Sequence, residues 1–156
     1  MKKNLFILNY PAHYRLPIYN KISDELNADF YFGDIPNSNI KKIESGDLNN
    51  FKGILKTIKL SSFYWYIGML KLIFKPYQNY ILTGDPFIIS NWIFLILAKV
   101  FNKKTILWSH GMYGRESNIR LVLKKMYFSL ADKLFLYGNY SKDILINCIS
   151  MFPKYS

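Results

Sequence analysis

Cysteine, arginine, histidine and glutamate are all scarce in this 156-residue chain. The single cysteine, Cys148, excludes an internal disulfide, and no cluster of metal-binding residue types surrounds it, so we expect no metal site. The apolar stretch near the amino terminus is too short for a signal peptide, and we therefore expect a cytoplasmic protein. No apolar run reaches the about 20 residues that a membrane-spanning helix needs.

The scarcity of acids and histidines also limits the chemistry that the chain can perform alone. It contains three glutamates and two histidines. No Ser–His–Asp set and no carboxylate pair can be identified at the expected strand ends. A hydrolase is therefore the weakest functional hypothesis, because no nucleophile–base pair is visible. The loop after the first expected strand has no glycine, which excludes a dinucleotide-binding fingerprint and a P-loop there.

Positive charge is abundant, and it comes mostly from lysine. The chain has 21 Lys and Arg against 10 Asp and Glu, a formal net charge of +11, and only three residues are arginine. Basic runs are no longer than pairs, whereas nucleic-acid readers usually cluster arginine on one element. We expect no nucleic-acid partner and infer an anionic environment, such as anionic lipid or a phosphorylated substrate.

Short apolar runs rich in strand-forming residues alternate with helix-length amphipathic segments, which is the pattern of β-α-β units. The sequence predicts a doubly wound α/β domain over residues 1–147, with one mainly parallel sheet, helices on both faces, and an irregular tail over 148–156. Helices are expected from Pro17 to about Leu26, over 63–74, over 87–101, after Ser117 and after Ser141. The expected strands are 4–9, 30–32, one within 53–60, 80–82, 105–108 and 133–137.

The expected helix 63–74 begins with four aromatic residues and ends before Pro76. Such a segment usually belongs to the core. Four lysines flank it, however, so a helix lying on an anionic membrane surface is the alternative. These lysines are Lys56, Lys59, Lys71 and Lys75.

In doubly wound sheets, ligands bind at the carboxyl ends of the strands. This rule selects the loops 10–15, 83–86, 109–117 and 138–141. Arginine can hold a phosphate or carboxylate, and imidazole can bond a sugar hydroxyl or accept a proton. Three structural alternatives stay open: an ion pair of Arg15 with Asp34, a structural role for His110, and helix N-caps at Asp85 and Ser141. The candidate ligand-binding residues are His13, Tyr14, Arg15, Gly84, Asp85, His110, Gly111 and Ser141.

Three segments in the expected order resemble a known family. Residues 11–19 follow the first strand with the sequence Pro-Ala-His-Tyr-Arg-Leu-Pro-Ile-Tyr, and Trp108-Ser109-His110-Gly111 ends the fifth strand. Ala131-Asp132-Lys133-Leu134 and Tyr140-Ser141-Lys142 enclose the last strand. Over residues 4–147 the chain is similar to the amino-terminal domain of GT-B glycosyltransferases of the glycosyltransferase 4 type.

This resemblance implies a two-domain enzyme that moves a sugar from a nucleotide-sugar to a hydroxyl, without a metal or other cofactor. The amino-terminal half would bind a sugar or lipid-linked acceptor in surface-polysaccharide or glycolipid synthesis, in peripheral contact with an anionic membrane. His110 would be the catalytic-loop histidine that contacts the donor sugar. The loop with Tyr14 and Arg15 would lie beside the leaving diphosphate or the acceptor.

The chain departs from the family in three respects. Its first loop is not glycine-rich, no two glutamates lie eight positions apart, and no second Rossmann-like half follows. We therefore expect a truncated protein that lacks the carboxyl-terminal donor domain and is inactive alone. The alternative hypothesis is a non-enzymatic basic α/β module that binds a membrane surface or another anionic partner.

Overall fold

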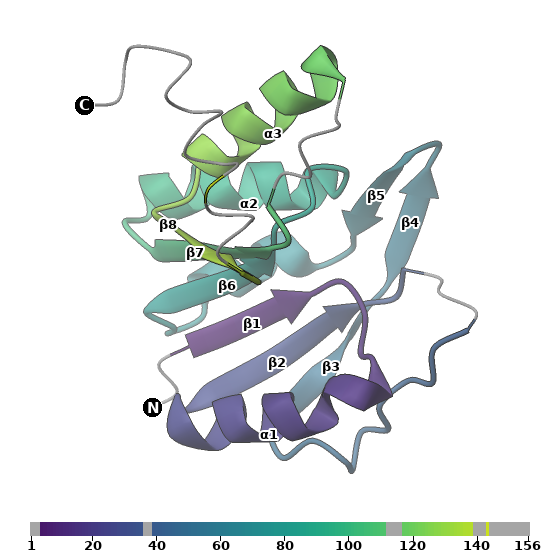
Figure 1. Cartoon of the computed structure of the whole chain (residues 1–156). Helices are drawn as coiled ribbons and strands as arrows, with labels where there is room; N and C mark the ends of the chain where they lie inside the picture. The colour runs from purple at the N-terminus through teal and green to yellow at the C-terminus, as the bar shows by residue number, and fades with distance from the viewer. Residues whose placement is uncertain (1–3, 36–38, 112–116, 139–142, 144–156) are drawn as a thin grey trace.

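The computed structural model of the protein describes residues 4–35, 39–111, 117–138 and 143. In this part of the chain six strands form one fully parallel sheet, as Figure 1 shows. All six strands expected from the sequence are present, which confirms the α/β fold. They are β1 (Asn4–Leu8), β2 (Ala28–Gly33), β3 (Phe51–Leu55), β6 (Asn79–Thr83), β7 (Lys104–Ser109) and β8 (Lys133–Leu136).

The strands lie in the order β3-β2-β1-β6-β7-β8, which is the strand order of a Rossmann domain. Helix α1 covers one face of the sheet, and α2 covers the other with α3 beside it (Figure 1). The connection after β1 therefore leaves toward one face, and the connection after β6 leaves toward the opposite face. The helices are η1 (His13–Arg15, 3-10), α1 (Leu16–Glu25), η2 (Met69–Phe74, 3-10), α2 (Ile89–Val100) and α3 (Asn118–Ser129).

The core lies on both faces of the central strand β1. Phe6 and Leu8 point toward α1, where they join a buried cluster with Tyr19, whereas Leu5 and Ile7 join the cluster of α2. A strand buried on both faces must be apolar at successive positions, which explains the unbroken run Leu-Phe-Ile-Leu. The apolar run that predicts a buried strand therefore forms β1, at the centre of the domain.

The predicted helix over 63–74 is wrong. Phe63–Tyr66 forms β5, which pairs antiparallel with β4 (Thr57–Leu60), and only Met69–Phe74 is helical, as η2. The strand expected within 53–60 is thereby split between β3 and β4. Aromatic residues favour strands, and Ser61 has a φ of 56°, which suits the tight turn between β4 and β5. Gly68, with a φ of 81°, separates β5 from η2.

Two further details differ from the sequence pattern. Helix α1 lies where a helix was expected, from Pro17 to about Leu26, but Ile18 and Leu26 are exposed and the helix buries Tyr19 and Ser23. Ser141 and the helix predicted after it lie outside the described residues, as does the tail 148–156.

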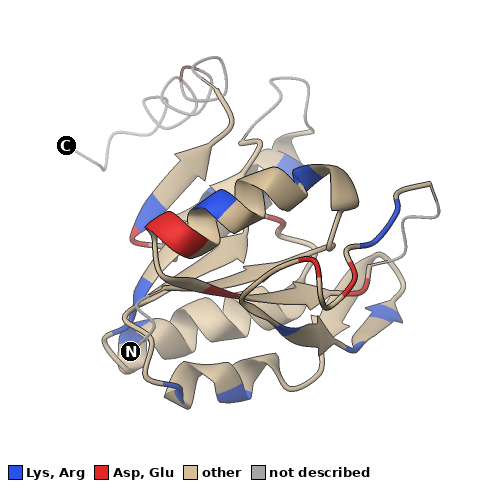
Figure 2. Ribbon diagram, turned by 90° about the horizontal axis from the view of Figure 1, so that it is seen from below, with Lys and Arg blue, Asp and Glu red and all other residues tan. Residues whose placement is uncertain are grey.

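Basic residues are spread around the described part of the molecule rather than gathered on one element, as Figure 2 shows. This distribution agrees with the diffuse field expected from paired lysines. Among the described helices, none combines the length and the hydrophobicity that a membrane-spanning segment requires.

Phe30 offers a test of the core on the α1 face. Its fully buried ring lies 4.9 Å from the ring of Phe6 and 5.5 Å from that of Tyr19. Phe30→Ala should lower the free energy of unfolding by about 3–5 kcal/mol, because it removes buried surface and leaves a cavity. Urea denaturation measures the change.

The control is Ile119→Ala on α3, whose side chain is 83% exposed, and this change should stay within about 0.5 kcal/mol. Equal losses in the two variants would contradict the core described above.

Candidate functional site

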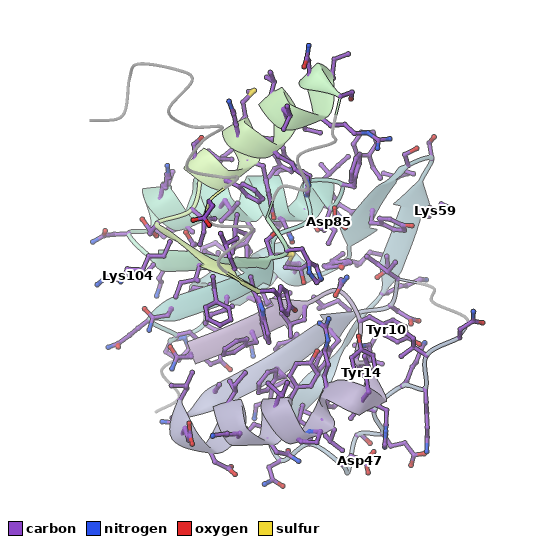
Figure 3. The ribbon with its side chains drawn as sticks, viewed as in Figure 1. Tyr10, Tyr14, Asp47, Lys59, Asp85 and Lys104 are labelled. Atoms are coloured by element: carbon purple, nitrogen blue, oxygen red, sulfur yellow. The ribbon has the colours of Figure 1, made fainter. Side chains whose placement is uncertain are left out.

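A cleft of about 450 Å³ opens at the carboxyl ends of β1, β6 and β7. It lies where the connections after β1 and β6 turn to opposite faces of the sheet, which is the usual ligand position in this fold. Figure 3 shows Tyr10, Tyr14 and Asp85 toward this end of the strands and Lys104 at the opposite edge. The cleft is therefore built by the loops that the strand-end rule selected.

Hydrogen bonds tie the three strand ends together. The Asn9 N–H donates to Thr83 Oγ1 at 2.9 Å, which joins the ends of β1 and β6. The Ser109 hydroxyl donates to the Gly84 carbonyl at 3.1 Å and accepts the Gly111 N–H at 3.0 Å. One serine hydroxyl thus links the end of β6 to the loop that carries His110.

Two positions in this frame need glycine. A Cβ on Gly84 would lie 2.3 Å from Ser109 Cβ, which is far inside contact distance. Gly111 has a φ of 75°, a left-handed conformation that residues with a side chain rarely adopt. The two glycines let the backbone of β6 approach Ser109 and let the chain turn directly after His110.

His110 stacks on Tyr137 at the mouth of the cleft. Their ring centroids are 4.2 Å apart at an interplanar angle of 13°, and Tyr137 also stacks with Trp108 at 5.7 Å. Partial desolvation lowers the pKa of His110 below the ordinary histidine value of 6.5, and the positive charges of Arg15 and Lys124 lower it further. The imidazole is therefore neutral near pH 7, when it can both donate and accept a hydrogen bond.

Arg15 lies among aromatic rings rather than beside an acid. Its guanidinium is 5.4 Å from the centroid of the Tyr14 ring and 5.7 Å from that of Tyr137. The alternative of an ion pair with Asp34 is wrong, because Asp34 pairs with Lys42. The guanidinium also forms hydrogen bonds with the side chains of Tyr19 and Tyr137. Because a guanidinium carries five N–H donors and keeps its charge, it can still bind an anionic ligand.

Asp85 is the one carboxylate among the described residues that line the cleft. Its Oδ1 accepts the Phe87 N–H at 2.9 Å, and burial raises the pKa of the carboxyl, an effect that Phe87 and Lys124 partly offset. The predicted N-cap role is wrong, since the N-cap residue of α2 is Ile88. Asp85 instead caps the turn that precedes the helix.

Lys124 brings a second cation to the cleft from α3. Its Nζ donates to the Gly111 carbonyl at 3.0 Å, so it also fixes the loop after β7. The cleft therefore combines two cations, one carboxylate, one neutral imidazole and stacked rings. Among the described residues, no group of three or more metal-binding side chains comes together.

Comparisons with protein-family models, curated proteins and solved structures found no match to this chain. The resemblance noted in the sequence thus stands on its own motifs, and the function has to be argued from the cleft itself.

Most of the candidate residues chosen from the sequence lie around this cleft. His13 does not, because it begins η1 with its side chain exposed outside the cleft lining, and Ser141 lies outside the described residues. Sequence reasoning missed Tyr137 and Lys124 as cleft residues. The position of Tyr137 directly after β8, a strand end like the others, was the signal that could have found it. The candidates that do line the cleft are Tyr14, Arg15, Gly84, Asp85, His110 and Gly111.

The electrostatic coupling of His110 to Arg15 is directly measurable. The His110 pKa, followed by the NMR shift of its ring proton, should lie below 6.5 in the unaltered chain. Arg15→Gln removes a positive charge beside the ring, so the neutral form loses its advantage and the pKa should rise. The control is Arg120→Gln on the exposed surface of α3, which should leave it unchanged. A His110 pKa that is indifferent to Arg15 would contradict the arrangement.

Proposed function

We propose that this chain is the acceptor-side half of a glycosyltransferase and that its cleft binds the sugar portion of a substrate with a negatively charged group. One observation carries the proposal. The segments after β1, β6, β7 and β8, together with Lys124 of α3, bring a carboxylate, a neutral imidazole, two cations and aromatic rings into one cleft at the switch point of a Rossmann sheet.

The aromatic and polar groups suit a sugar ring. Tyr14 and Tyr137 line the cleft, are exposed, and present aromatic surface against which the C–H face of a sugar can pack. Asp85 and His110 can accept hydrogen bonds from its hydroxyls. Trp108 also lines the cleft, so the NMR signal of its indole N–H can report on a bound ligand.

The two cations suit a phosphate group. Arg15 and Lys124 both line the cleft, and a guanidinium binds phosphate through paired, charge-assisted hydrogen bonds. They would hold a phosphorylated acceptor or stabilise the diphosphate as it leaves. The alternative that both cations serve structure alone accounts for the Lys124 bond to Gly111 and for the hydrogen bonds of Arg15 with the Tyr19 and Tyr137 side chains. It does not explain why both cations line the same cleft.

In the proposed reaction, the bond between the anomeric carbon and the diphosphate oxygen breaks. A new bond forms from that carbon to the acceptor oxygen, and the proton of the acceptor hydroxyl passes to the departing diphosphate. His110 would contact the sugar near the reacting carbon, as the family resemblance implies. The groups that would grip a nucleotide belong to a second domain, so this chain alone should neither transfer sugar nor bind nucleotide tightly.

Binding measurements test the proposal. Two-dimensional NMR with a panel of hexose and hexosamine phosphates should show millimolar binding that shifts the indole N–H signal of Trp108. Arg15→Gln should weaken that binding about tenfold, since a charge-assisted hydrogen-bond pair is worth about 1.5–3 kcal/mol. Arg120→Gln is the matched control and should leave the affinity unchanged.

Two results would count against the proposal. The first is that no sugar phosphate shifts the Trp108 signal at any accessible concentration. The second is that calorimetry of the isolated chain detects micromolar affinity for UDP or GDP, because this would place the nucleotide site in this half.

A non-enzymatic module that binds an anionic surface is the second candidate. The observation that favours it lies on a different part of the molecule, the apolar outer face of the β4–β5 hairpin. His110→Ala separates the candidates. It should impair sugar binding in the first case and change nothing in the second.

A further inference from the structure

The hairpin formed by β4 and β5 has one face in the core and one face outward. Residues paired across an antiparallel hairpin lie on the same face, so Thr57 and Tyr66 share one face and Ile58 and Trp65 share the other. Tyr66 is buried, which fixes the first face as the inner one. The outer face carries only apolar side chains: Ile58, Leu60, Phe63 and Trp65.

This apolar hairpin face is unusual for a surface. An antiparallel pair with one side toward water normally alternates between apolar inner and polar outer residues. Here Leu60 is 52% exposed, and Ile58 and Phe63 are exposed as well. The hairpin is also firmly attached to the domain, because the Tyr64 N–H donates to the Phe87 carbonyl at 2.9 Å and the Tyr66 N–H donates to Ser90 Oγ at 3.2 Å.

Exposed apolar side chains continue from the hairpin into its neighbours. Phe74 at the end of η2 is 72% exposed and lies 5.2 Å, between ring centroids, from Phe101. On α2, Ile93, Ile96 and Val100 form an exposed stripe at helical spacing. Large exposed apolar patches mark places where a protein meets another protein or a membrane.

The charge of this region selects between those partners. Between Asp47 and Glu116 the sequence has one acid, Asp85, which lies in the cleft. A second copy of the chain would oppose lysines with lysines across a symmetric interface, which is unfavourable. An anionic bilayer matches both the apolar side chains and the cations. The lysines on or next to the hairpin, η2 and α2 are Lys56, Lys59, Lys71, Lys75 and Lys99.

We propose that the apolar hairpin face docks on the surface of an anionic lipid bilayer, with Lys56, which directly precedes β4, against the headgroups. The alternative raised from the sequence was a membrane-surface helix in this region, and the structure has a hairpin there instead. The outer side chains would enter the boundary between headgroups and acyl chains, where aromatic residues such as Trp65 are favoured. The inference is independent of sugar transfer in the cleft.

Co-sedimentation with vesicles tests the proposal. The chain should bind vesicles containing phosphatidylglycerol and should not bind vesicles of phosphatidylcholine alone. The double variant L60S/F63S should lose at least about tenfold in partitioning, because the buried apolar area supplies much of the binding. The control Ile119→Ser, an exposed apolar residue on α3, should bind as the unaltered chain does.

The electrostatic part has a control with the same net charge. Lys56→Gln should lower partitioning about fivefold, since each lysine near an anionic surface contributes on the order of 1 kcal/mol. Lys104→Gln removes one charge elsewhere, at the amino end of β7 (Figure 3). Equal losses in the two variants would mean that net charge alone attracts the chain, and would overturn the proposal.

A fluorescence measurement locates the contact even if L60S/F63S folds poorly. Brominated phosphatidylglycerol should quench the tryptophan emission of the bound chain, and Trp65→Phe should remove most of that quenching. Quenching unchanged by Trp65→Phe would overturn the proposal. So would a dimer in sedimentation velocity without lipid that L60S/F63S dissociates, because a second copy would then occupy the face.

The same variants separate this inference from the proposed function. L60S/F63S should leave sugar-phosphate binding in the cleft unchanged, and His110→Ala should leave vesicle binding unchanged. Failure of one proposal therefore does not imply failure of the other.

Discussion

The parallel pairing of β1 with β6 is the constraint on which the rest of the structure depends. At this pairing the chain reverses the direction in which strands are added, so α1 and α2 leave toward opposite faces. The divergence opens the cleft, and the bond from the Asn9 N–H to Thr83 Oγ1 closes the bottom of it. The groups of the candidate site lie around the paired strands β1 and β6. Tyr137 belongs to the site although it directly follows β8, which lies two strands away from β6 in the sheet. A doubly wound sheet thus creates a site before any particular chemistry is assigned to it.

Much of the fold could be predicted from the sequence, because a buried parallel strand needs consecutive apolar residues. Gly, Pro and Asn residues mark where these apolar runs end. The six strands were recoverable in this way. The segment 63–74 was not, since an aromatic run satisfies both a buried helix and a strand, and only pairing with 57–60 decides between them. Within α1 the spacing of Ile18, Ile22 and Leu26 predicts the helix correctly. Of these three residues only Ile22 packs against the core cluster, and the buried residue is Tyr19.

The candidate site was predictable to the extent that strand ends could be placed. Arg15, Asp85 and His110 each follow an expected strand closely, and the parallel topology brings them to one edge. Lys124 could not be found in this way, because it lies within α3 and reaches Gly111 through the packing of that helix. His13 was expected beside the ligand but lies outside the cleft lining, and the reason is local. The short helix η1 turns His13 away from the cleft, whereas Tyr14 and Arg15 of the same helix line it.

The hairpin joins the two surfaces that carry the proposals. Its inner face supports the region beneath the cleft: the Tyr66 ring fills the space in which a Gly33 side chain would stand, and the charge of Asp85 contributes to raising the Tyr66 pKa after burial itself. Its outer face is the apolar one. A partner that binds the outer face would therefore act on an element that contacts the end of β2 and the segment that follows β6. If the bilayer is that partner, docking would hold the cleft close to the membrane surface, where a lipid-linked acceptor would present its head group.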